Sequence, residues 1–132
     1  MPRKPRLHIP HGVYHVMLRG NDRQRIFFDA DDHRCLEELF TGGLARYACR
    51  IHAYCWMPNH IHLAIQIEDR PLGALMQWVA AQYARVFNRR YRRSGHLFER
   101  RHRAIWVDAD RYLLALVRYI HHNPVRAGIA SG

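Results

Sequence analysis

Two short β-rich segments on either side of a turn constrain the fold of this chain most strongly. Residues 50–56 and 60–67 flank a Met-Pro-Asn sequence at 57–59, which predicts a β-hairpin. Successive side chains of a strand point to opposite faces, so His60 and His62 lie on one face of the second strand. Two imidazoles about 6–7 Å apart along a strand can bind one divalent metal ion. The hairpin therefore predicts part of a sheet and a candidate reaction centre on it.

The pairing of the two strands decides which side chains share the face of these histidines. We expect Trp56 to lie opposite His60, which puts Tyr54 opposite His62. Three further polar side chains then belong to the same face: Arg50, His52 and Gln66. A sheet face that carries His, Tyr and Arg suits a ligand better than a packed core does.

The rest of the hydrophobic pattern predicts two more strands and three helices. The strands are expected at 13–18 and 103–107, and the helices at 29–47, 71–91 and 110–122. The first six elements follow the order β-α-β-β-α-β of a ferredoxin-like sandwich, with an antiparallel sheet and two helices on one face. We place the last helix beside the open, histidine-bearing face. The predicted fold class is α+β, with a single domain over residues 1–132.

Composition indicates a cytoplasmic protein that binds nucleic acid. The formal net charge is +10, from 20 arginines and one lysine against 11 acidic residues. Such a surface favours polyanions, and genome composition is the bland alternative source of the arginine bias. No apolar run is long enough to span a membrane. The three cysteines form no Cys-x-x-Cys pair, so neither a disulfide framework nor a structural zinc site is expected.

The last predicted helix carries side chains that could act on the histidine face. Tyr112, Tyr119 and Asn123 fall within about 40° of one another around a helix axis. A divalent ion held by His60 and His62 would polarise a phosphoryl oxygen, and a phenol could then attack the phosphorus. The chain has no dense carboxylate cluster for two-metal hydrolysis. This combination predicts phosphodiester cleavage through a covalent phosphotyrosine.

Five sequence blocks resemble those of a known family, in the same order. His60-Ile61-His62 resembles the His-hydrophobe-His motif of the HUH endonucleases. The blocks as a whole resemble the REP-associated tyrosine transposases, a branch of the single-tyrosine transposases of bacterial insertion sequences. They are Tyr14-His15-Val16, Arg19-Gly20-Asn21, and residues 57–63, 95–98 and 119–128. The resemblance extends from about His8 to Ile129, nearly the whole chain.

The resemblance implies a metal-dependent single-stranded DNA endonuclease and strand transferase acting at palindromic, REP-like hairpins. Tyr119 would attack the phosphodiester, leaving a 5′-phosphotyrosine and a free 3′-hydroxyl. His60 and His62 would bind Mg²⁺ or Mn²⁺, and Asn123, four residues after the tyrosine, would complete the metal shell. Two alternatives remain for the third metal ligand, His15 and His122. One alternative remains for the nucleophile, Tyr112.

The expected DNA contacts come from basic and aromatic side chains. Candidates for phosphate contact are Arg19, Arg50, Arg85, Arg89, Arg92, Arg93, Arg100 and Arg101. Candidate platforms for base stacking are His52, Tyr54 and Trp106. The resemblance also implies a bacterial, nucleoid-associated protein that works as a monomer, with its tyrosine acting in cis.

Two other functions compete with this one. A domesticated relative would bind hairpin DNA without cutting it. Loss of the nucleophile or of the metal ligands would identify such a protein, and this chain retains all of these residues. A histidine-triad nucleotide hydrolase shows His-φ-His-φ-His, but this chain has Ala64 at the third histidine position.

Overall fold

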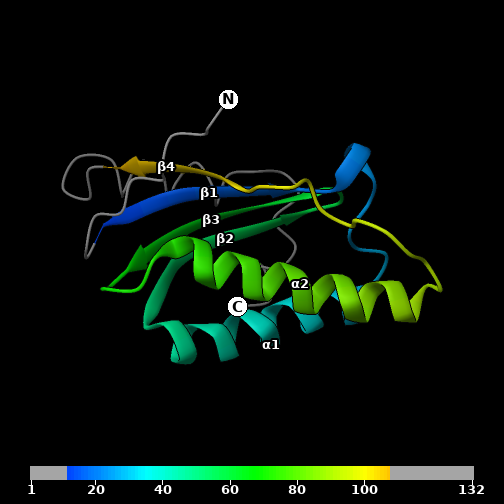
Figure 1. Cartoon of the computed structure of the whole chain (residues 1–132), viewed down its shortest axis with the longest axis horizontal. Helices are drawn as coiled ribbons and strands as arrows, with labels where there is room; N and C mark the ends of the chain where they lie inside the picture. Colours follow the sequence, from blue (N-terminus) through cyan, green and yellow to red (C-terminus); the bar gives the residue numbers. More distant parts are fainter. Residues whose placement is uncertain (1–11, 108–132) are drawn as a thin grey trace.

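The structure, a computed structural model, describes residues 12–107 as a four-stranded sheet with two helices (Figure 1). The elements are β1 (Val13–Arg19), α1 (Ala30–Tyr47), β2 (Cys49–Met57), β3 (His60–Ile67), α2 (Leu72–Arg90) and β4 (Arg103–Val107). A short 3₁₀ turn at Asn21–Arg23 follows β1. The order β-α-β-β-α-β is the predicted one, and each element begins and ends within one residue of its predicted bounds.

The sheet has the topology expected of a ferredoxin-like sandwich. Its strands pair antiparallel in the spatial order β2-β3-β1-β4. Figure 1 shows α1 and α2 side by side on one face of this sheet. The predicted α+β fold is therefore confirmed for the described residues. The helix predicted at 110–122, which would carry Tyr119, lies outside them.

The two helices pack on the sheet through the apolar stripes predicted for them. A Cβ atom at Gly43 of α1 would lie 2.6 Å from Cδ1 of Leu75 of α2, so this glycine permits close approach of the helices. Asp29 caps α1 by accepting a hydrogen bond from the Asp32 N–H at 3.1 Å. Within residues 12–107, neither helix combines the length and hydropathy needed to cross a membrane.

The pairing of β2 with β3 differs from the predicted register by one residue. Met57, rather than Trp56, lies opposite His60, because the turn contains only residues 58–59. Tyr54 consequently lies on the face covered by the helices. Its predicted place on the histidine face is wrong, since a slip of one residue moves every side chain of a strand to the other face.

Burial of Trp56 explains the observed register. Its indole is 2% exposed and stacks on Phe40 of α1, with ring centroids 5.8 Å apart. The predicted register would have removed this large apolar surface from the helices. A bulge between Ile51 and Ala53 shifts the alternation again, so Arg50 lies opposite Gln66 on the histidine face, as predicted.

A buried carboxylate joins the beginning of α1 to the end of α2. Asp32, which is 3% exposed, accepts hydrogen bonds from the Phe28 N–H at 2.8 Å and the Tyr91 hydroxyl at 2.6 Å. Nη1 of Arg90 donates to the other carboxylate oxygen at 2.9 Å. Nη2 of Arg90 reaches Asp29 at 2.7 Å. The network connects segments that are far apart in the chain.

Replacing Asp32 with alanine should lower the free energy of unfolding by about 3 kcal/mol, because buried donors would lose their acceptor. Asp31 provides a matched control: it is exposed on the same helical turn, pairs with Arg34 at 3.1 Å and lies farther from Arg90, at 3.5 Å. Asp31→Ala should cost less than about 1 kcal/mol, as exposed ion pairs do. Urea unfolding followed by circular dichroism measures both. Equal losses in the two variants would contradict a stabilising role for the buried network.

Candidate metal centre and nucleic-acid interface

His60 and His62 project from β3 on the sheet face opposite the helices. His60 lies opposite Arg19 of β1, and His62 lies opposite Met17. The centroids of the two imidazole rings are 4.9 Å apart. Strand alternation alone predicts that the two rings share a face, and their edge-on arrangement allows ring nitrogens of both to approach one ion.

Each of these imidazoles has its Nδ1 atom in a hydrogen bond. His60 Nδ1 lies 2.7 Å from Oδ1 of Asn59, the preceding turn residue. His62 Nδ1 lies 3.1 Å from Nε2 of His15 on β1, and the two rings stack with centroids 5.3 Å apart. Both rings are thereby held in one orientation by neighbouring side chains.

The local electrostatics favour neutral imidazoles. Burial, and after it the positive charge on His60, His15 and Arg19, together lower the pKa of His62 to about 4. Burial, followed by the Arg19 guanidinium, lowers the pKa of His60. Burial also lowers the pKa of His15. Neutral imidazole is the form that binds a metal ion, so these histidines need no deprotonation at neutral pH.

The donor set fits part of a divalent metal site. Two neutral imidazoles on one face are suitable ligands, but no group of three or more His, Cys, Asp or Glu side chains within residues 12–107 is arranged to hold a metal. Further ligands would have to come from water, from substrate or from residues outside that range. The predicted ligand Asn123, its alternative His122, and the predicted nucleophile Tyr119 with its alternative Tyr112 all lie outside the described residues.

The stability of the protein should fall with acid through His62. Its pKa of about 4 in the folded protein lies below the ordinary 6.5, so the unfolded chain binds more protons between these values. The stabilisation is fully present above pH 6.5 and is lost as the pH falls toward 4. From His62 alone we expect unfolding to be easier by about 2 kcal/mol at pH 4.5 than at pH 7. Urea titrations of wild type and His62→Leu test this; an equal pH dependence in both would contradict it.

The arginines predicted to contact DNA occupy separate parts of the surface. Arg19 lies on the histidine face beside His60, and it lowers the pKa of both His60 and His62. Arg50 is on the same face but toward the far end of β3, opposite Gln66. The others are exposed on α2 or in the loop that follows it: Arg85, Arg89, Arg92, Arg93, Arg100 and Arg101.

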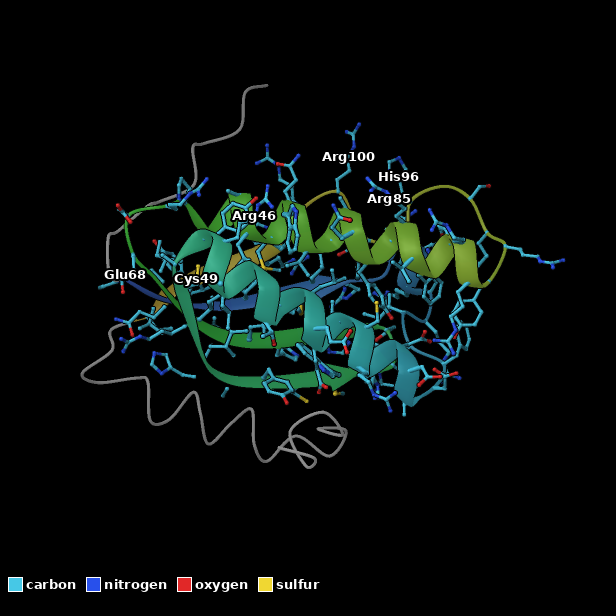
Figure 2. The ribbon with its side chains drawn as sticks, turned by 90° about the horizontal axis from the view of Figure 1, so that it is seen from below. Arg46, Cys49, Glu68, Arg85, His96 and Arg100 are labelled. Carbon is cyan, nitrogen blue, oxygen red and sulfur yellow. The ribbon has the colours of Figure 1, made fainter. Side chains whose placement is uncertain are left out.

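Two of these arginines, Arg100 and Arg101, border a groove between α2 and the loop before β4. The groove has a volume of about 800 Å³. Small α2 residues such as Ala80 and Ala84 form one wall. The other wall is mainly basic: it carries His96, Arg100, Arg101 and His102 beside a single acidic residue, Glu99. Figure 2 shows Arg85, His96 and Arg100 on the same side of α2. His96 and His102 were missed by the sequence reasoning, because only the fold brings this loop against α2.

The three predicted stacking platforms lie in different environments. Tyr54 packs against Trp56 at 4.7 Å between ring centroids, and its hydroxyl reaches Glu37 of α1. His52 is exposed at the bulge of β2 and lies within hydrogen-bond distance of Gln66, at 2.9 Å. Trp106 is exposed on β4, opposite Tyr14. His52 and Trp106 are therefore accessible to a base, whereas Tyr54 is packed between the sheet and the helices.

Sequence reasoning also overlooked Asn59, which it treated only as a turn residue. His15 was considered as a third ligand, yet the structure shows it hydrogen-bonded to His62 Nδ1. In the sequence, the indication that His15 could matter was its place in a predicted strand, where it alternates with apolar residues. The missing information was the β1–β3 register, which places His15 opposite Ala64, diagonal to His62.

Known families and structures match this chain over most of its length. A family model described as IS200-like transposase matches residues 9–123. No curated protein matches the chain. The solved structure of a REP-associated tyrosine transposase bound to a REP hairpin is similar over 97% of this chain and 75% of its own, with a TM-score of 0.78 and 17% identity. A proposed transposase from Deinococcus radiodurans is similar over 91% of this chain and 96% of its own, with a TM-score of 0.62 and 16% identity.

The structural matches show a shared fold, since their sequence identities are low. The family match is more specific, because it spans the paired histidines as well as the positions of Tyr119 and Asn123. This chain belongs to the family of IS200-like transposases.

Proposed function

We propose that this protein is a metal-dependent endonuclease and strand transferase for single-stranded DNA at palindromic, REP-like hairpins. The main support is the pair of neutral, oriented imidazoles of His60 and His62 beside Arg19, in a chain of the IS200-like transposase family. The solved relative bound to a REP hairpin suggests this class of DNA. Such a substrate would place the protein at the bacterial nucleoid.

In the proposed reaction, the Tyr119 hydroxyl attacks a phosphodiester of the single strand. A bond forms between the tyrosine oxygen and phosphorus while the bond from phosphorus to the 3′-oxygen breaks. The phenol loses its proton, and the departing 3′-oxygen gains one. The products are a 5′-phosphotyrosine and a free 3′-hydroxyl, and a 3′-hydroxyl reverses the same step to rejoin strands.

His60 and His62 would hold Mg²⁺ or Mn²⁺, with Asn123 as the proposed third protein ligand. When bound, the ion would offset the negative charge that develops on the phosphoryl oxygens. Arg19 lies next to this pair and would attract the phosphate by its charge. We propose a monomer in which Tyr119 serves the metal site of its own chain.

The basic groove beside α2 is a suitable path for the DNA backbone. Arg100 and Arg101 line it, and Arg85 lies along the same helix side (Figure 2). Phosphate contacts of this kind dominate the affinity of DNA-binding proteins and weaken with salt. Arg50 lies away from the groove and would contact only DNA that extends along the histidine face.

Metal removal tests the proposed activity directly. A labelled hairpin oligonucleotide with a single-stranded flank, incubated with the full-length protein and Mn²⁺, should give an adduct that survives denaturing electrophoresis. EDTA should abolish the adduct, and excess Mn²⁺ should restore it. Binding of the hairpin without any adduct under Mn²⁺ or Mg²⁺ would overturn the proposal in favour of a non-cleaving hairpin-binding protein.

A further inference from the structure

The hydrogen bonds around the paired histidines indicate a role for two residues that are not ligands themselves. We propose that Asn59 and His15 are positioning residues that hold His60 and His62 as Nδ1-protonated tautomers, so that both offer Nε2 to one metal ion. This inference rests on the proposed metal site. Ligand histidines in metalloproteins commonly donate their other N–H to a neighbouring acceptor, which fixes tautomer and ring orientation.

The tautomer of His60 follows from the chemistry of its partner. Oδ1 of Asn59 can only accept, so at 2.7 Å the Nδ1 atom of His60 must donate. The orientation of the Asn59 amide is supported by its other end, where Nδ2 donates to the Arg23 carbonyl at 3.4 Å. The imidazole of His60 therefore carries its hydrogen on Nδ1 and has a free lone pair on Nε2.

The pairing of His62 with His15 leads to the same assignment once a metal binds. Of the two nitrogens 3.1 Å apart, one donates and the other accepts. A metal ion on Nε2 of His62 requires hydrogen on Nδ1, which then donates to Nε2 of His15. The stacked arrangement, with an interplanar angle of 29°, keeps His15 close to the ring it orients.

The location of His15 supports positioning rather than ligation. It lies opposite Ala64, so its ring reaches the flank of His62 and contacts Nδ1. Within residues 12–107, moreover, His15 does not join His60 and His62 in a three-residue metal-binding arrangement. Its side chain acts on the metal through His62.

Histidine tautomers in the metal-free protein provide the first test. Long-range ¹H–¹⁵N spectra at pH 7 should show His60 with its proton on Nδ1. In Asn59→Ala the proton should move toward Nε2, because the acceptor is gone. A wild-type His60 protonated on Nε2 would overturn the assignment without bearing on whether the protein cuts DNA.

Metal affinity provides the second test. Mn²⁺ is the probe, and electron paramagnetic resonance measures the concentration of unbound Mn²⁺. His15→Phe keeps an aromatic ring but removes the acceptor, and should weaken Mn²⁺ binding by about 10–100-fold. His15→Gln should rescue it, because the glutamine Oε1 can occupy the place of Nε2 and accept. Met17→Leu, on the same strand face, is the control and should leave affinity unchanged.

The outcomes separate the inference from the proposed function. Rescue by glutamine, with thermal melts showing folded variants, supports the positioning role. Equal affinity in wild type and His15→Phe overturns it while the metal site stands. Loss in His15→Gln as large as in His15→Phe also overturns it, because that result identifies His15 as a ligand. A wild-type protein with no affinity for Mn²⁺ overturns both the metal site and this inference.

Discussion

Replacing Tyr119 with phenylalanine should abolish covalent capture of a labelled hairpin oligonucleotide and leave its binding within a few-fold of wild type. The change removes one hydroxyl, and with it the only atom proposed to bond to phosphorus. Phosphate contacts by arginines supply most of the affinity and do not involve this group. Denaturing electrophoresis measures the adduct, and a mobility-shift assay at fixed salt measures binding.

Tyr112→Phe is the matched control for Tyr119, because both tyrosines belong to the same predicted helix. This variant should still form the adduct. An adduct that persists in Tyr119→Phe and disappears in Tyr112→Phe would move the nucleophile to the other tyrosine. Persistence in both variants would show that neither phenol is the attacking group.

Replacing His62 with alanine should remove Mn²⁺-dependent cleavage, by at least about 10²-fold, the scale on which one preorganised electrostatic contact affects a rate. His62 is 8% exposed and bound through Nδ1 to His15. Its loss would remove a proposed ligand and leave His60 as the remaining imidazole of the pair. Single-turnover cleavage at saturating Mn²⁺, together with the Mn²⁺ affinity, measures the effect. His60→Ala should behave in the same way.

His33→Gln is a control for removing a histidine elsewhere. His33 lies on α1, on the other side of the sheet, where its ring packs edge-on against Phe27 at 4.5 Å. The variant should cleave at the wild-type rate. Thermal melts exclude unfolding as the cause of any loss in His62→Ala. Undiminished metal-dependent cleavage in folded His60→Ala and His62→Ala would refute the proposed metal site.

The sequence was sufficient for those features that depend on local periodicity. A period of 3.6 residues marks α1 and α2, and a period of two marks the strands, so these six elements of residues 12–107 were each placed within one residue. The same alternation puts His60 and His62 on one face of β3, whatever their surroundings. The element order then indicated the ferredoxin-like topology before any contact was known.

Local patterns did not determine strand register. Both possible turns around Pro58 are compatible with the hairpin, and each places Tyr54 on a different face. The register was decided by Trp56, whose indole stacks on Phe40 of α1, sixteen residues earlier in the chain. Burial against a distant helix therefore decided which side chains accompany the histidines.

The sequence by itself determined the order of helices and strands within residues 12–107, the placement of the two histidines on one face of β3, and the basic character of the chain. Only the tertiary structure decided that His15 lies against His62 and that Asp32 accepts a hydrogen bond from Arg90. It also decided that the loop before β4 forms a groove with α2. The reason is physical: alternation and helical periodicity are properties of neighbouring residues. Contacts across the sheet depend instead on which packing buries the most apolar surface and satisfies the buried polar groups.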